Sequence, residues 1–151
     1  MPGSDTIWMT FTLPSASGSE VVPGFPDVEA IVAAQLRDSG LAVGDRAYTE
    51  IPADPVYPLI TVQRVGGVPA IRRYLDAAEI QIDVWGTSKA EARDIADAAR
   101  VACHALAGTA WSDPVTAWVS AVEDSTGLLW LPDDLTGQDR YLFGVRVFLH
   151  E

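Results

Sequence analysis

The sequence predicts an α+β fold, in which a mostly antiparallel sheet carries two main helices on one face and an extended arm precedes them. Two stretches repeat apolar residues at helical spacing, and several others alternate apolar and polar residues as half-buried strands do. A length of 151 residues suits one domain with a sizeable core. We therefore expect a single domain over residues 26–151 and an N-terminal arm over residues 1–25.

The arm contains "TIWMTFTLP", whose period-two alternation is typical of a strand, followed by the flexible tract "SASGSE". It has no Lys or Arg, so it lacks the charged start of a signal peptide. Two interpretations remain open: a disordered leader, or a strand that adds to the sheet edge of a neighbouring subunit.

In "PDVEAIVAAQLRDSG" the spacing predicts a helix that starts at Pro26 and Asp27 and ends at Gly40. A short strand is expected over 46–51, and prolines at 52, 55 and 58 mark an irregular stretch or a sheet edge. Strands are then expected over 59–65 and 78–86. The segment between these strands is too long for a tight turn and should project as an extended loop or a two-stranded ribbon.

In the strand over 78–86, apolar and polar residues alternate. Ile80, Ile82 and Val84 are expected to face the core, and Glu79, Gln81 and Asp83 to face away from it. Such alternation is typical of a sheet that helices cover on only one face.

A second helix should follow, because Ser88 and Glu91 form an S-x-x-E capping box. A stripe of mainly small residues faces inward, and Gly108 stops the helix. Three strands complete the prediction: one near 115–123, a short one over 128–131 and a last one over 141–149. The turn-forming "PDDLTGQD" separates the final two.

No catalytic, cofactor or metal motif is found. Cys103 and His104 are neighbours, but adjacent helical side chains diverge by about 100°, so Cys103 is predicted to be a small core residue. Asp133, Asp134 and Asp139 share a loop without the spacing of a calcium-binding loop. Walker A and G-x-G-x-x-G patterns are absent. We therefore expect no enzyme, no cofactor and no metal.

The net charge of −11 argues against sequence-specific DNA binding, because nucleic-acid binders carry a basic stripe. No apolar run reaches membrane-span length, so no membrane association is expected. What remains are residues suited to protein contacts. The candidate interface residues are Arg64, Arg72, Arg73, Tyr74, Glu79, Gln81, Asp83, Trp130, Asp133 and Asp134.

Four segments together resemble the tail terminator proteins of long-tailed bacteriophages: "PDVEAIVAAQLRD", "YPLITVQRVGG", "AAEIQIDVWGTSKAEARDIADAARVAC" and "GLLWLPDDLTGQDRYLFGVRVFLH". The resemblance covers roughly residues 26–150 and lies in pattern, without a diagnostic motif. It implies a structural virion protein without catalytic residues, assembled in the host cytoplasm and located at the head–tail junction.

The same resemblance implies a ring, hexameric in this family, that caps the head-proximal end of the tail tube, stops its growth and presents a surface to the head. Its partners would be itself, the tail tube protein and a head completion or stopper protein, with DNA only as cargo passing through. Two edges of each subunit must then differ, and the 64–79 segment or the outward residues of the 78–86 strand are candidates. Alternatives are another head–tail connector or stopper, a small-ligand-binding α+β domain and, third, an enzyme.

Overall fold

The computed structural model describes residues 24–72 and 74–151, so the strand predicted at 7–13 and the candidate Arg73 lie outside the described residues. The elements are α1 (Val28–Arg37), β1 (Ala47–Tyr48), β2 (Leu59–Gly66), β3 (Pro69–Ile71), β4 (Leu75–Gly86), α2 (Lys89–His104), β5 (Thr109–Trp111), β6 (Ala117–Trp130) and β7 (Asp139–His150). The predicted α+β class is confirmed.

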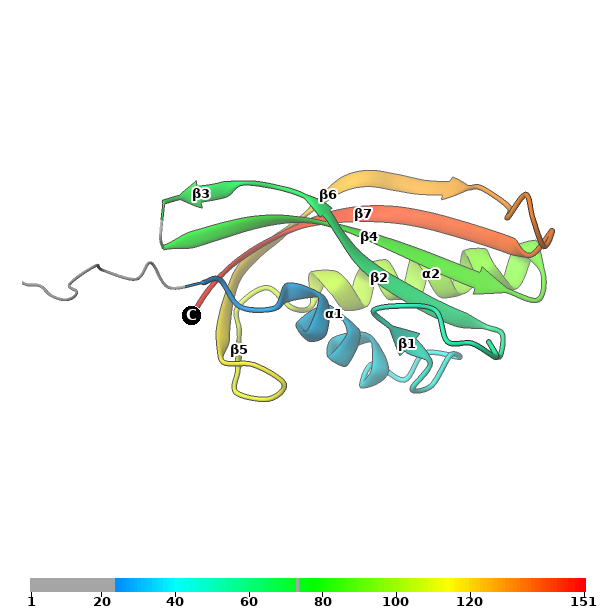
Figure 1. The fold of residues 1–151 in the computed structure, drawn as a ribbon, viewed down its shortest axis with the longest axis horizontal. Coiled ribbons are helices and arrows are strands. Elements are labelled where there is room, and N and C mark those ends of the chain that lie inside the picture. The colour runs from blue at the N-terminus through cyan, green and yellow to red at the C-terminus, as the bar shows by residue number, and fades with distance from the viewer. Residues whose placement is uncertain (1–23, 73) are drawn as a thin grey trace, which may run out of the picture.

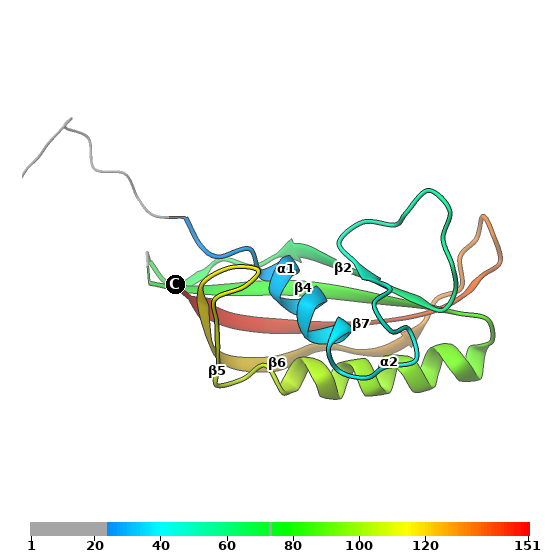
Figure 2. The same ribbon diagram turned by 90° about the horizontal axis from the view of Figure 1, so that it is seen from below.

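The strands form one sheet in the order β1-β2-β4-β7-β6-β5, with β3 pairing on an extension of β4. Every strand pair is antiparallel except β1 with β2. Both helices lie on the same side of this curled sheet, as Figures 1 and 2 show. The central strands β4 and β7 pair without interruption from Asp76 to Gly86, so they form the centre of the sheet.

Helix α1 begins where predicted, because the Asp27 side chain accepts a hydrogen bond from the Ala30 amide at 3.2 Å. Its apolar face is buried against the sheet and α2. Helix α2 begins at the predicted cap, where the Glu91 amide donates to Ser88 Oγ at 3.1 Å. The Glu91 carboxylate bonds Thr87 rather than Ser88, which shifts the reciprocal half of the capping box by one residue.

The core joins the two helices to the inner face of the sheet. Cys103 is fully buried there, and burial raises the pKa of its thiol to about 12, which confirms its prediction as a core residue. Gly86 lies so close to α2 that an added Cβ would meet the Ala92 backbone nitrogen at 2.8 Å. The strand can therefore turn into the helix only with glycine at this position.

The prediction of separate strands at 115–123 and 128–131 is wrong, because one strand, β6, runs from Ala117 to Trp130. Its register against β7 shifts between Val119 and Ala121, between Asp124 and Thr126, and between Thr126 and Leu129. These bulges absorb the turn-like "DSTG" without breaking the pairing. Gly144 of β7 makes room for one of them, since an added Cβ would meet Ser125 Oγ at 2.8 Å.

Two smaller differences concern short strands. The strand predicted over 46–51 is confined to β1, and β5 was not predicted at all. The segment between β2 and β4 is the two-stranded ribbon that was one of the two alternatives. None of the helices within the described part of the chain is long and apolar enough to cross a membrane.

Candidate functional site

The structure brings exposed apolar side chains together at one end of the molecule, on the segment over residues 65–74, which we call the ribbon. Its exposed large side chains are Val65, Val68, Ile71 and Tyr74, with exposed fractions of 57, 74, 56 and 71%. Arg72 is also exposed. Figure 1 shows the ribbon projecting beyond both helices, so these side chains are available for contact with another protein.

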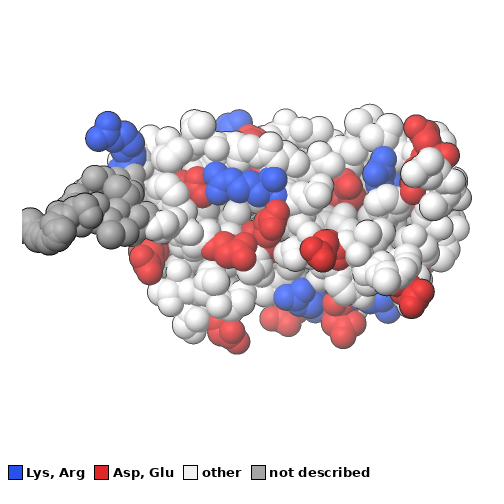
Figure 3. Space-filling model, viewed as in Figure 1, with Lys and Arg blue, Asp and Glu red and all other residues white. Residues whose placement is uncertain are grey.

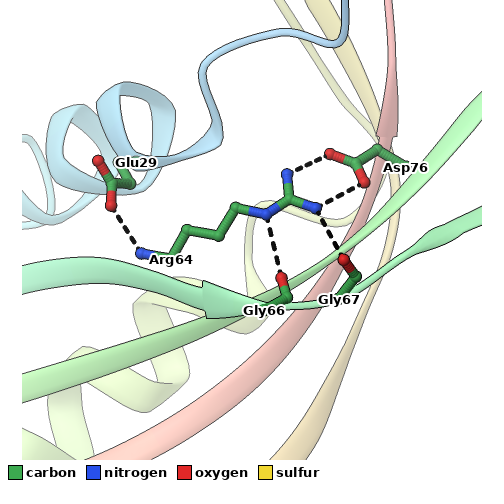
Figure 4. A network of polar contacts seen from close by, with 5 residues as sticks. All are labelled: Glu29, Arg64, Gly66, Gly67 and Asp76. Atoms are coloured by element: carbon green, nitrogen blue, oxygen red, sulfur yellow. Dashed lines mark hydrogen bonds and ion pairs between the residues drawn. The ribbon is translucent and has the colours of Figure 1, made fainter.

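A polar network fixes the base of the ribbon (Figure 4). The Arg64 guanidinium donates to both carboxylate oxygens of Asp76, at 2.5 and 2.9 Å, and to the carbonyls of Gly66 and Gly67. The Asp76 side chain is 1% exposed and that of Arg64 32%. The hydrogen bond from Arg64 to Asp76 is the main cause that raises the pKa of Arg64. Arg64 is thus engaged within the subunit, and this orients the ribbon.

The network also reaches α1, because the Arg64 backbone amide donates to Glu29 Oε2 at 2.6 Å. Gly67 follows with φ +94°, and an added Cβ there would overlap the Ala77 carbonyl oxygen. Only glycine permits the chain to turn so close to β4. The ribbon is therefore held to the sheet and to a helix at the same point.

Glu79, Gln81 and Asp83 lie on the sheet face opposite the helices, as predicted, but β4 is a central strand and they form no sheet edge. Arg146 of β7 binds Glu79 at 2.7 Å and Glu123 at 3.7 Å. The side of the molecule turned to the viewer in Figure 3 likewise has blue groups beside red ones and wide uncharged areas. Among the described residues, neither the outer sheet face nor the side seen in Figure 3 therefore carries a basic stripe.

Asp83 differs from its neighbours, because it is only 8% exposed. Burial raises the pKa of its carboxyl, against the opposing effects of a 3.1 Å hydrogen bond from Gln81 and of Arg140. The segment after β1 lies beside Asp83 on the outer sheet face. Together they border an open pocket of about 370 Å³. The pocket is lined by Thr49, Glu50, Ile51, Thr61, Gln63, Asp83 and Trp85. Asp83 therefore suits internal packing better than subunit contact.

The opposite end of the molecule carries a second exposed apolar surface on residues 128–138, which we call the tip. Leu129, Trp130, Leu131 and Leu135 are 50, 41, 44 and 95% exposed. The Lys89 ammonium of α2 lies 3.9 Å from the centre of the Trp130 ring, a cation–π contact that holds the ring against the helix. Ribbon and tip lie at the two ends of the long axis (Figure 1).

Asp133 shapes the tip as a turn cap. Its carboxylate accepts from the Leu135 amide at 3.1 Å and from Thr136 Oγ1 at 2.8 Å, and these contacts lower the pKa of Asp133. Asp134 is exposed beside it. Within residues 24–72 and 74–151, no three Asp, Glu, His or Cys side chains are grouped so as to hold a metal ion.

Between the two ends, Asp124 ties β6 to α2. It accepts hydrogen bonds from Arg100 at 2.5 and 3.0 Å and pairs with His104 Nε2 at 2.7 Å. The Arg100 bonds, followed by the His104 contact, lower the pKa of Asp124 to about 2. His104 thus points toward β6, away from any pairing with the buried Cys103.

The sequence did not predict several residues that form ion pairs, hydrogen bonds or cation–π contacts in the structure: Asp76, Lys89, Arg100, Arg140 and Arg146. Each contacts a residue that is distant in sequence or on another strand, so its role depends on register. For Asp76 a signal did exist, because a carboxylate in the inward phase of β4 requires a partner.

This arrangement defines a class: an α+β domain with exposed apolar surfaces at both ends and charge pairs within its faces. The family model described as tail completion protein gp17 matches residues 29–127. The chain therefore belongs to the tail completion protein gp17 family and is a structural component of phage-type virion tails.

A solved structure entitled "Virion of native gene transfer agent (GTA) particle" contains a chain with the same fold. It is 20% identical in sequence, with a TM-score of 0.59, and the match covers 80% of this chain and 92% of that one. No curated protein matches the sequence.

Proposed function

We propose that this protein is a tail terminator, which forms a ring of six copies that caps the head-proximal end of the tail tube. The ring would end tube polymerisation and then offer a surface for joining to the head. Membership of a tail completion family supports a role at this stage of assembly. The observation that carries the proposal is the pair of unlike apolar surfaces, ribbon and tip, at opposite ends of one subunit.

The distinction between the two surfaces matters because a closed ring uses heterologous contacts. One surface of each subunit must fit a different surface of its neighbour, and further surfaces must meet the tube protein and a head completion or stopper protein. Exposed apolar groups of this size on a small soluble subunit are typical of interaction sites. In our proposal residues 26–151 act as the assembling domain.

DNA would pass through the ring as cargo without specific binding. The net charge of −11 supports this, since carboxylates repel phosphates. The arginines described on the outer sheet face support it too: Arg140 and Arg146 both lie beside carboxylates. A lumen lined by such a surface would let DNA slide without holding it.

Electron microscopy of tail tubes assembled with and without the protein tests the proposal. We expect tubes of uniform length with an extra ring at one end in its presence, and over-long tubes in its absence. A Tyr74→Asp variant adds a control for the ribbon, because Tyr74 is 71% exposed and its replacement should leave the fold intact. Equal lengths and equal ends with and without the protein would contradict termination and favour a connector or stopper role.

A further inference from the structure

A groove opens on the helix layer between the end of α1 and the second half of α2. Its volume is about 500 Å³, and the residues that line it include Gln35, Ser39, Leu41, Ala98, Val101 and Ala105. Val101 is 61% exposed, although it is a large apolar residue on a helix. The Gln35 side-chain amide donates to the Ala102 carbonyl at 3.0 Å, so the two helices are joined at the groove and its shape is set in advance.

The rim of this groove is acidic. Asp94 lies one helical turn before Ala98, on the same face of α2. Its side chain is 80% exposed, and its Oδ1 lies 3.9 Å from Nη1 of the exposed Arg93. Asp38, the residue after α1, is exposed beside Ser39. The groove therefore combines an apolar floor with negative charge at its margin.

The ribbon has the complementary chemistry. Its exposed side chains are apolar apart from Arg72, and residues 65–72 and 74 include no acidic residue. The Arg64–Asp76 pair orients it away from its own helices. It therefore presents apolar side chains and a positive charge to a surface outside its own subunit.

We propose that the ribbon of one copy docks into the α1–α2 groove of the next copy. Val68, Ile71 and Tyr74 would cover the apolar floor around Val101, while Arg72 would meet Asp94 and Asp38 at the rim. Because donor and acceptor surfaces differ and lie on the same chain, the contact is heterologous and propagates from copy to copy. This inference rests on the proposed ring and names the surfaces that build it.

Thiol cross-linking tests the contact in the full chain. Ile71→Cys and Val101→Cys are combined and treated with a flexible bifunctional thiol reagent, both on the free protein at high concentration and on purified tails. Cys103 contributes little background, because burial raises the pKa of its thiol to about 12. The double variant should give a ladder of covalent oligomers beyond the dimer, whereas each single variant, as matched control, should stop at the dimer. A double variant that stops at the dimer in both samples would overturn the proposal.

Charge exchange provides an independent test. Arg72→Asp should lower the ladder yield about two- to fivefold, the range expected for an exposed ion pair. Adding Asp94→Arg should restore it, whereas adding Asp134→Arg at the tip should not. Equal yields in all these variants would remove Arg72 and Asp94 from the contact.

The tube-length assay separates this inference from the proposed function. If the cross-linked oligomers form but tube length is not controlled, the ribbon–groove contact is supported and termination is contradicted. If tube length is controlled but the cross-linked oligomers do not form, termination is supported and the ribbon–groove contact is contradicted.

Discussion

The ribbon and the tip each expose four large apolar side chains, yet they are held to the domain in different ways. Besides the pairing of β3 with β4, the ribbon is fixed at its base by one buried ion pair, between Arg64 and Asp76. The tip depends on several exposed contacts, including those of Asp133 and the cation–π contact of Trp130. Loss of Arg64 should therefore loosen the base of the ribbon in one step, whereas the tip should lose its contacts one at a time.

The largest loss in the free energy of unfolding is expected for Arg64→Met. Removal of the guanidinium leaves the Asp76 carboxylate, whose side chain is 1% exposed, without its partner. Breaking a buried pair in this way costs about 3–5 kcal/mol, and the partial exposure of Arg64 reduces the expected loss to about 2–3 kcal/mol. Urea unfolding measures the change in free energy of unfolding.

Arg72→Met is the matched control for Arg64→Met, because Arg72 is an exposed arginine of the same ribbon. Its effect should stay within about 0.5 kcal/mol. Adding Asp76→Leu to Arg64→Met should recover much of the lost stability, since a buried ion pair can be replaced by apolar groups. Equal midpoints for the Arg64 and Arg72 variants would contradict the contrast between the two ends.

A smaller, pH-dependent effect on stability is expected at Asp124, which lies between the ribbon and the tip. Its pKa is about 2 in the folded protein, below the ordinary value of 3.8, so the carboxylate stabilises the fold above about pH 4. This stabilisation is lost as the pH falls from about 4 toward 2. Because the side chain is 42% exposed, solvent screening limits the effect at neutral pH to about 1 kcal/mol or less.

Thermal unfolding followed across this pH range measures the contribution of Asp124. Asp124→Asn should be slightly less stable than the unmodified protein at pH 7 and should converge with it near pH 2. A constant difference between the two proteins over the whole range would show that the carboxylate charge is not the cause.

The smallest effect is expected for Asp133→Ala at the tip. The Leu135 amide and the Thr136 hydroxyl lose their acceptor, but both lie at the surface, where water replaces it. Amide exchange at Leu135 should accelerate while the unfolding midpoint stays nearly unchanged. Asp134→Ala, one residue away, should alter neither quantity. A large fall in the midpoint of the Asp133 variant would mean that the tip is held as the ribbon is.

Local signals predicted the helices well. The caps at Asp27 and Ser88 lie where the residue types require them, and the inward phase of β4 follows from its period-two pattern. They failed for β6, because "DSTG" has turn propensity and the long pairing with β7 overrides it. The burial of Asp83 was also missed, since it depends on a distant segment that lies beside it on the sheet face.

The candidate contact residues were predicted less well, and for a related reason. Arg64 was taken as a surface contact because nothing local assigns its partner, which lies 12 residues further on across a ribbon. The exposure of Tyr74 and Trp130 agrees with a contact role and does not test it. Residue type indicates which side chains suit an interface, but only the register of the strands decides which of them are already engaged.

The bulges in β6 have a consequence for the protein before it is incorporated. Among the described strands, β5 pairs with β6 only at Ala117–Val119, so the rest of this long strand has one open side. A regular, open strand favours edge-to-edge pairing of copies, whereas the repeated register shifts of β6 discourage it. Association of copies through this strand is therefore disfavoured, which leaves their assembly to other surfaces of the subunit.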